Sequence, residues 1–121
     1  MEICPGIHLL RIPFVIPVSP EVHLERWVNM VLLYGRRVHL VDCGVAAGLP
    51  VIQSYLEAAG RCLDEVATLL HTHAHPDHIG ASRPLHEATG CRVAMHAAEK
   101  AWLEDVDLQA RQRPVPGFAT L

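Results

Sequence analysis

The sequence predicts an α/β (α+β) chain in which helices pack on a β-sheet. Two short β-rich runs flank a glycine-containing turn at residues 34–36, which is typical of a β-hairpin. Apolar residues recur at helical spacing over Leu49–Ala59, and the nearly all-apolar run Val66–Leu70 is typical of a strand buried on both faces. With 121 residues, 50% of them hydrophobic and 19% charged, the chain forms one globular domain or a piece of a larger one.

The first strand is expected at Gly6–Ile12, where Ile7, Leu9 and Ile12 follow a Cys-Pro-Gly turn. Proline fixes φ and has no N–H donor, so the prolines of the first 25 residues are expected to break that region into extended and looped pieces. They are Pro5, Pro13, Pro17 and Pro20.

The hairpin is expected from a run at Trp27–Leu33 and a second run at Arg37–Val41. The second run ends at Asp42, which is followed by Cys43 and Gly44. A strand end holds a carboxylate rigidly where a loop begins, but aspartate and glycine are also common turn residues. The residues alone leave both a functional and a turn-forming role for Asp42 open.

The remaining elements alternate between helix and strand. A helix is expected at Leu49–Ala59, with Gly60 as its end, and another from Pro76–Gly90. A strand at Cys91–Met95 and a helix at Ala97–Arg111 complete the pattern.

Composition and charge argue against several classes of protein. The formal net charge is −3 at pH 7 and the basic residues are scattered, so no surface for nucleic acid or anionic membranes is expected. The chain start lacks a signal-peptide pattern and no apolar run could span a bilayer, which predicts a cytoplasmic location. The four widely spaced cysteines are expected to be reduced and mostly buried, and Trp27 and Trp102 are expected in the core.

A cluster of histidines with one aspartate follows the run at Val66–Leu70. The pattern HxHxDH is formed by His73, His75, Asp77 and His78. Neutral imidazole and carboxylate are ligands of zinc and related divalent metals. A chance group of solvated histidines is the alternative, but so many potential ligands directly after a buried strand favour a metal site.

The spacing indicates how these side chains could meet. In an extended chain, His71, His73 and His75 point to the same side, because side chains alternate. Asp77 and His78 come after the proline bend and can return to the same point, which favours a two-metal site. A bound metal lowers the pKa of water to about 7, from 15.7, and so supplies hydroxide. His71 itself is expected to be a packed or hydrogen-bonded strand residue.

The segment Thr72–Gly80, about thirty residues after Val41–Gly44, resembles the signature of the metallo-β-lactamase-fold hydrolases. Asn29–Leu33 is similar to an early strand of that family, and Val93–His96 is similar to the strand after the motif helix. The resemblance implies two β-sheets sandwiched between helices, with metals at one edge. Because the family fold is longer, residues 1–121 are expected to be a single partial domain. It would be the N-terminal half of the αββα sandwich, one mixed β-sheet with helices on one face, with the C-terminal half absent.

The resemblance also implies roles for the site residues. His73 and His75 would bind a first metal ion, and Asp77 and His78 a second. Asp77 would also be the catalytic residue that orients the attacking water, while Asp42 would support the metal loop by hydrogen bonds. Zinc is the expected cofactor, as one or two ions, with iron or manganese as alternatives. The diiron branch of the family usually carries glutamate at the place of His75, which favours hydrolysis here.

The expected function is that of a metal-dependent hydrolase fragment, in which hydroxide attacks an ester, thioester, lactone or amide bond. Two alternatives stay open: a catalytically inactive metal-binding or structural half-domain, and the phosphodiesterase or nuclease branch of the family. No histidine follows His96, and Asp105 and Asp107 fall in an expected helix, so the later ligands of the family are missing. Two ligands per metal should bind zinc weakly and give little activity alone.

A half-sandwich would expose the apolar sheet face that the second half normally covers, and soluble monomers rarely tolerate so large a patch. We therefore expect a two-fold homodimer in which one sheet covers its copy. A small-molecule substrate is expected once a second half completes the site. Neither nucleic acid nor a membrane is expected as a partner.

Overall fold

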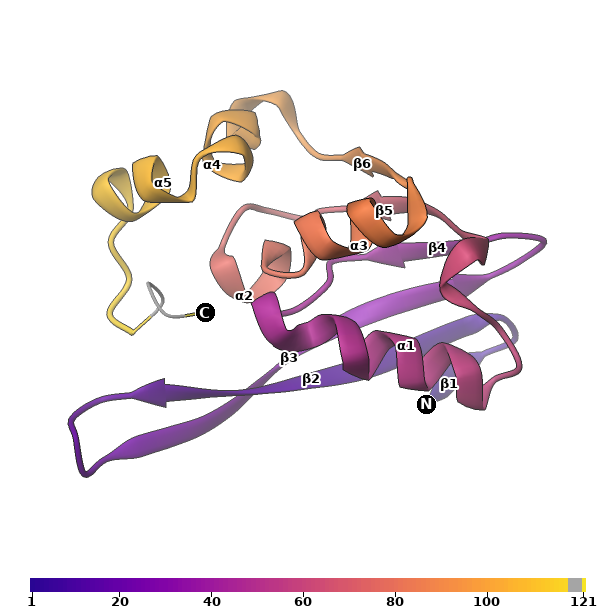
Figure 1. Ribbon diagram of the computed structural model, residues 1–121, viewed down its shortest axis with the longest axis horizontal. Coiled ribbons are helices and arrows are strands. Elements are labelled where there is room, and N and C mark those ends of the chain that lie inside the picture. The colour runs from indigo at the N-terminus through magenta and orange to yellow at the C-terminus, as the bar shows by residue number, and fades with distance from the viewer. Residues whose placement is uncertain (118–120) are drawn as a thin grey trace.

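The computed structural model describes residues 1–117 and 121, and it confirms the predicted fold class. Six strands form one mixed sheet whose spatial order follows the chain order (Figure 1). They are β1 (Glu2–Cys4), β2 (Ile7–Pro17), β3 (His23–Tyr34), β4 (Val38–Val41), β5 (Val66–Leu70) and β6 (Arg92–Ala94). Strands β1 to β4 pair antiparallel, whereas β4, β5 and β6 pair parallel. The carboxyl ends of the last three strands therefore meet at one edge of the sheet.

The helices pack on one face of the sheet and beyond its edge (Figure 1). They are α1 (Leu49–Ala58), α2 (Pro76–Ile79), α3 (Ser82–Thr89), α4 (Lys100–Glu104) and α5 (Val106–Gln112). The expected helix from Leu49 is confirmed, and Gly60 follows its end with a left-handed φ of 70°. Within the described residues, no helix has the length and apolar character needed to cross a membrane.

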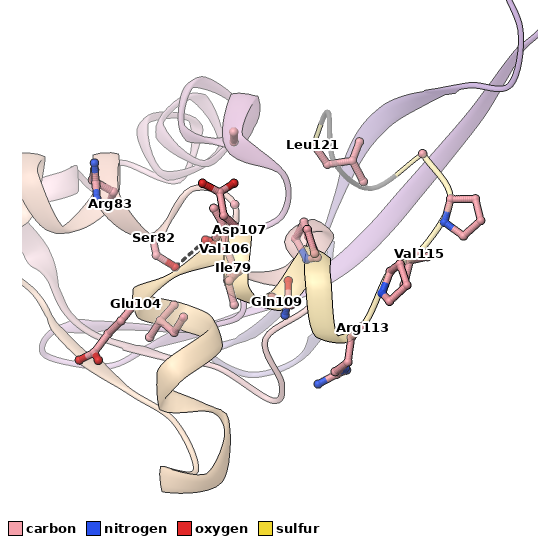
Figure 2. A pocket seen from close by; sticks show the side chains of 18 residues that line it. Ile79, Ser82, Arg83, Glu104, Val106, Asp107, Gln109, Arg113, Val115 and Leu121 are labelled. Carbon is pink, nitrogen blue, oxygen red and sulfur yellow. Dashed lines mark hydrogen bonds between the residues drawn. The ribbon is translucent and has the colours of Figure 1, made fainter.

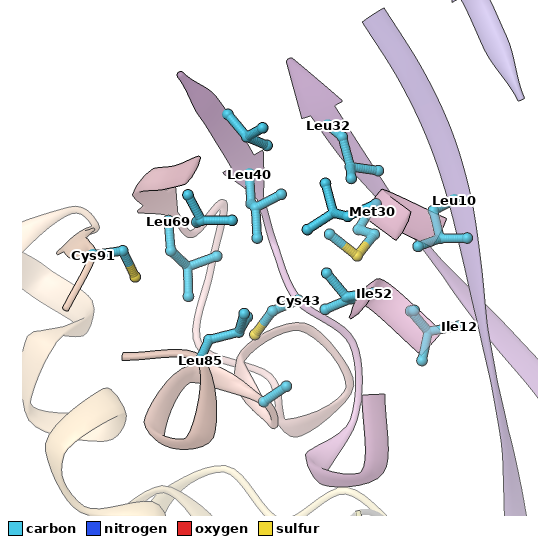
Figure 3. Close-up of a cluster of buried hydrophobic side chains, with 14 of the residues drawn as sticks. Leu10, Ile12, Met30, Leu32, Leu40, Cys43, Ile52, Leu69, Leu85 and Cys91 are labelled. Carbon is cyan, nitrogen blue, oxygen red and sulfur yellow. The ribbon is translucent and has the colours of Figure 1, made fainter. Parts of the chain in front are cut away.

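The hydrophobic core lies between the sheet and the helices α1 and α3 (Figure 3). In β2, β3 and β4, side chains at alternate positions point into it, as the period of a strand requires. In β5 the pairing with β4 shifts register, so its core residues Val66 and Leu69 are three positions apart. The strands contribute Leu10, Ile12, Val28, Met30, Leu32, Val38, Leu40, Val66 and Leu69, and the helices contribute Ile52, Leu56 and Leu85. This packing fixes the register of the strands that carry the site.

The other face of the sheet is more open. The register aligns Leu9, Val31, Val41 and Leu70 in one row across β2 to β5. The first three are half-buried, and Leu70 is 45% exposed. The expectation that β5 is buried on both faces is therefore wrong, because the helices cover only one side of it. Association of two copies through this face stays a prediction.

The N-terminal region forms a long hairpin instead of the expected broken loop. Strands β2 and β3 pair from Ile7 opposite Leu33 to Pro17 opposite His23. The N–H of Leu9 donates to Met1 at 2.8 Å, which places it on the side away from β3. Pro13 and Pro17 lie four and eight positions after Leu9, so their backbone nitrogens point to the same side as that of Leu9. The missing N–H groups are therefore on the outer edge of β2, where proline is tolerated.

Two expected helices are interrupted. The first is divided into α2 and α3 between Ile79 and Ser82. The second is divided at Asp105, which has an extended backbone (φ −138°, ψ 95°) and accepts the N–H of Leu108 at 2.9 Å as the N-cap of α5. In the sequence, apolar residues keep their helical spacing on both sides of Asp105, so the pattern did not predict a break there.

The tryptophans and cysteines are less buried than expected. Trp27 is 57% exposed, with the Arg11 guanidinium 5.2 Å from its ring centroid, and Trp102 is half-buried. All four cysteines are free, as expected, but only two of them are buried. Cys43 and Cys91 are the buried pair, whereas Cys4 and Cys62 are exposed.

Thiol reactivity should divide the cysteines in the same way. Burial raises the pKa of the Cys43 thiol to about 12, so at pH 8 it stays protonated and unreactive. We expect iodoacetamide to modify Cys4 and Cys62 in the native protein, and all four cysteines in denaturant, as counted by mass spectrometry. Native modification of Cys43 at the rate of Cys4 would contradict the described packing.

Candidate metal centre

The histidine loop, residues 71–78, leaves the carboxyl end of β5 beside the carboxyl end of β4. Val41 and Leu70 are paired residues of these parallel strands, so Asp42 and His71 follow them side by side. The N–H of Asp42 donates to the carbonyl of Leu70 at 2.8 Å, and the N–H of His71 donates to a carbonyl of β6 at 2.8 Å. The loop therefore starts from a fixed position at the sheet edge.

The carboxylate of Asp42 ties the two ends of the histidine loop together. It accepts the backbone N–H of Thr72 at 2.9 Å, the Thr72 hydroxyl at 2.8 Å and Nδ1–H of His78 at 2.9 Å. The backbone of Asp42 has a left-handed φ of 63°, which aspartate tolerates better than most residues. Burial alone would raise the pKa of Asp42, but His71, His78 and Thr72 outweigh it and hold the pKa well below its usual range.

Hydrogen bonds determine which nitrogen of His73 carries the proton. The Thr72 hydroxyl donates to Asp42, so it accepts from Nδ1–H of His73 at 2.9 Å. The lone pair of neutral His73 is then on Nε2, which lies 3.2 Å from Nδ1 of His75. Burial and the imidazoles of His78 and His75 lower the pKa of His73. This shift favours the neutral form that metals bind.

Asp77 and His78 form a second pair. Because Nδ1–H of His78 donates to Asp42, its lone pair in the neutral form is on Nε2, 3.7 Å from Oδ2 of Asp77. Burial opposes the charged form of His78, but the hydrogen bond and charge of Asp42, with the charge of Asp77, raise its pKa. Oδ1 of Asp77 is buried without a hydrogen-bond partner among the described residues. A buried carboxylate oxygen beside an imidazole nitrogen suits a cation.

The chemistry of these donors fits metal ions, with two ligands in each pair. Two nitrogens bound to one tetrahedral zinc lie roughly 3.3 Å apart, and Nε2 of His73 lies 3.2 Å from Nδ1 of His75. The rings of His73 and His78 are also close, with 4.1 Å between their centroids. Over residues 1–117 and 121, however, no three side chains of the ligating types converge to hold an ion. Each ion would need further ligands.

One contact opposes metal binding at His75. Nη2 of Arg113 donates to Nε2 of His75 at 2.8 Å, so the proton of neutral His75 is on Nδ1, facing His73. An ion at Nδ1 would replace that proton, and Nε2 would then carry a proton that cannot face a guanidinium donor. Arg113 would have to turn away, and its ion pair with Glu99 at 3.1 Å offers it another partner.

His71 packs behind the loop and outside the ligand pairs. The Ser82 hydroxyl donates to the carbonyl of Ile79 at 2.7 Å and accepts Nε2–H of His71 at 2.7 Å. Nδ1 of His71 lies 3.6 Å from Asp42, and the side chain is fully buried. This position agrees with the expectation of a packed, hydrogen-bonded residue.

Gly80 lets the helix α2 approach the segment that follows β4. The N–H of Cys43 donates to the carbonyl of His78 at 2.9 Å, and the N–H of Gly80 donates to Gly44 at 2.8 Å. A Cβ at Gly80 would overlap the backbone of residues 45–46. The motif therefore requires glycine here for packing, a role that the spacing alone did not indicate.

Sequence reasoning missed two side chains that hold the loop from outside. The N–H of Ala74 donates to the carboxylate of Glu99, and the side-chain amide of Gln109 donates to the carbonyl of Ala74. Both residues belong to the segment expected only to be helical. Gln109 is 2% exposed, but a polar residue on a polar helix carries no sequence signal of burial.

A cavity of about 870 Å³ adjoins these contacts (Figure 2). Its walls come from α2 and the start of α3 on one side, and from α4, α5 and residues 113–117 on the other. The volume lies in the range of small-molecule pockets. Gln109 and Arg113 line the cavity and also contact the histidine loop, so they lie between the two.

Comparison with known proteins identifies the family. The model of the metallo-beta-lactamase superfamily matches residues 26–118, which include Asp42 and the whole histidine loop. The chain belongs to the metallo-beta-lactamase superfamily. The resemblance seen in the motif is thereby confirmed.

Two curated relatives of this chain are named hydroxyacylglutathione hydrolase. A hydroxyacylglutathione hydrolase of Ectopseudomonas mendocina is 48% identical over 73 residues, which are 60% of this chain and 26% of the relative. A hydroxyacylglutathione hydrolase of Rhodopseudomonas palustris is 37% identical over 84 residues, 68% of this chain and 33% of the relative. The chain thus spans about a quarter to a third of the length of the relatives it matches.

Solved structures agree with the fold. A metallo-beta-lactamase family protein of Thermus thermophilus matches with a TM-score of 0.70 and 31% identity, over 92% of this chain and 36% of that chain. A motif mutant of a metallo-beta-lactamase from Cronobacter sakazakii matches with a TM-score of 0.67 and 25% identity, over 84% of this chain and 36% of that chain.

Removal of the Asp42 charge should loosen the histidine loop. Asparagine tolerates the left-handed φ of residue 42 but brings an NH₂ group towards donors, so Asp42→Asn leaves at least one partly buried donor unpaired. We expect a loss of about 1–3 kcal/mol in the free energy of unfolding, measured with urea. The exposed Asp64→Asn is the control and should stay within about 0.5 kcal/mol of wild type. Equal stability of the two variants would refute the role given to Asp42.

Gly80→Ala should also destabilise the chain, because the added methyl group meets backbone that cannot move freely. We expect a loss of about 1–3 kcal/mol or more, from the urea midpoint. Gly35→Ala is the control, since the nearest atom to its new Cβ would be 3.7 Å away, at ordinary contact distance. A Gly80→Ala protein as stable as this control would mean that α2 does not pack as described.

Proposed function

We propose that this chain supplies one side of the metal centre of a zinc-dependent thioester hydrolase. The observation that carries the proposal is the pair of ligand sets, His73 with His75 and Asp77 with His78, held at the sheet edge by Asp42. The name hydroxyacylglutathione hydrolase of the relatives, up to 48% identical, supports a glutathione thioester as substrate. The metallo-beta-lactamase names belong to structural neighbours that are less similar in sequence.

In this proposal His73 would hold a first ion through Nε2 and His75 through Nδ1, while Nε2 of His78 and the carboxylate of Asp77 would hold a second. Asp42 keeps the proton of His78 on Nδ1, which leaves Nε2 free. Zinc, when bound, lowers the pKa of water to about 7 and polarises a carbonyl. Iron or manganese are the alternatives that the same donors admit.

Asp77 has the second task of orienting the attacking water. Its Oδ1 is buried and lacks a hydrogen-bond partner among the described residues, so a turn of the side chain would let it accept a hydrogen bond from water. Attack of the water oxygen on the thioester carbonyl breaks the carbon–sulfur bond. The products are a carboxylic acid and a thiol, and the second proton of the water ends on the sulfur.

The alternative is a catalytically inactive half-domain that binds metal or is purely structural. Two observations favour it: each ligand pair has only two members, and Arg113 donates to a nitrogen of His75, which opposes metal binding there. Zinc binding without thioester turnover would select this alternative.

Zinc content and thioester turnover test the proposal together. We expect His73→Ala to lower zinc affinity at least about tenfold, measured by competition with a chromophoric chelator, because it removes half of one pair. His23→Ala, at an exposed position of the hairpin, is the control and should bind as wild type does. Turnover of a hydroxyacyl-glutathione thioester should be low and should require zinc and His73. Equal zinc affinity in both variants would refute the proposal that His73 binds a metal ion.

A further inference from the structure

The peptide groups around Ala74 are held on both sides by side chains that come from far along the chain. Ala74 separates the two histidines of the first pair and is fully buried. Its N–H donates to Glu99, 25 residues later, and its carbonyl accepts from Gln109, 35 residues later. Both backbone polar groups of this one residue are therefore satisfied by side chains from outside the loop.

The conformation of Ala74 determines how the two imidazoles meet. His73 and His75 lie on either side of it, and their facing nitrogens are 3.2 Å apart. A change in φ or ψ of the residue between them would swing one ring relative to the other. Because ligand nitrogens must keep their separation to bind one ion, the two hydrogen bonds to Ala74 restrain a distance that matters for metal binding.

The side chains that hold Ala74 are themselves fixed. Glu99 accepts Nη1–H of Arg113 at 3.1 Å, and the Arg113 guanidinium lies 4.3 Å from the ring centroid of Trp102. The cap at Asp105 starts α5 so that Gln109 is buried, with 2% of its surface exposed. Burying a glutamine costs free energy unless its amide is hydrogen-bonded, and the carbonyl of Ala74 provides that bond.

We propose that Gln109 and Glu99 are positioning residues for the ligand pair His73 and His75. Their proposed role is to fix the peptide between the two ligands. The affinity for metal would then depend on Gln109 in α5 and on Glu99, directly before α4, although neither residue is a ligand in this proposal. This inference rests on the proposed function, but the restraint on the loop can be measured without metal.

The matched variants are Gln109→Glu and Gln112→Glu, on the same helix. Glutamate at 109 removes the N–H donor and places a carboxylate oxygen against a carbonyl. Glutamate at 112 keeps the oxygen that accepts Nε1–H of Trp102 at 2.8 Å. Gln109→Met, which lacks both donor and charge, serves if Gln109→Glu fails to fold. Glu99→Gln keeps an acceptor for Ala74, whereas Glu99→Ala removes it.

With metal, we expect Gln109→Glu and Glu99→Ala to weaken zinc binding about 10–100-fold, and Gln112→Glu to leave it unchanged. The visible absorption bands of the cobalt-loaded protein should change in the first two variants only, since these bands report ligand geometry. Glu99→Gln should restore most of the affinity. Wild-type affinity and cobalt spectra in Gln109→Glu, Gln109→Met and Glu99→Ala would overturn the inference while leaving the proposed function intact.

Without metal, hydrogen exchange provides the second measurement. The amide of Ala74 should exchange faster in Glu99→Ala and Gln109→Glu, while amides of β3 and β4 keep their protection. If the wild-type chain binds no zinc, the proposed function fails. Hydrogen exchange at the Ala74 amide then tests by itself whether Glu99 and Gln109 restrain the loop. Faster exchange confined to the loop then supports it, and unchanged exchange at Ala74 refutes it.

Discussion

The buried carboxylate of Asp42 is the interaction on which the rest of the site depends. It follows β4, accepts three hydrogen bonds from Thr72 and His78, and so closes the histidine loop onto the sheet edge. A left-handed φ in a residue other than glycine costs about 1–3 kcal/mol, and a hydrogen bond to a charged group contributes about 1.5–3 kcal/mol. Three such bonds outweigh the strain, which explains why aspartate rather than glycine stands at this turn.

From Asp42 a chain of hydrogen bonds runs through the loop to the last helix. The Thr72 hydroxyl donates to Asp42, His73 donates to Thr72, His75 donates to His73, and Arg113 donates to His75. Each donor fixes the proton of its neighbour. The lone pair of His73 already faces the ligand position, whereas that of His75 faces Arg113. The two histidines of one pair therefore differ: one is prepared for a metal ion, and the other must exchange its proton position first.

Periodic patterns predicted the elements that have regular burial. The predicted bounds of β5 and α1 lie within one residue of the observed bounds. The histidine loop follows the carboxyl end of β5, as predicted. The predicted hairpin of β3 and β4 is present, but the β2–β3 hairpin was missed. Pro13 and Pro17 break a strand only where a partner strand needs an N–H donor, and an edge position is not visible in the sequence. Contacts of Glu99 and Gln109 with Ala74 were missed for a similar reason: they join residues 25 and 35 positions apart and follow no period.

The loop is thus restrained by chain segments on both sides of it, Asp42 before it and the helical segment after it. Restraints of this kind reduce the conformational entropy that a flexible loop would lose on binding an ion. Weak zinc binding by this chain would then follow from the number of ligands in each pair, not from disorder of the loop. Two variants separate these causes: one that removes a ligand, at His73, and one that removes a restraint, at Gln109. Both should lower affinity, but only loss of the restraint should also speed hydrogen exchange at Ala74 in the metal-free chain.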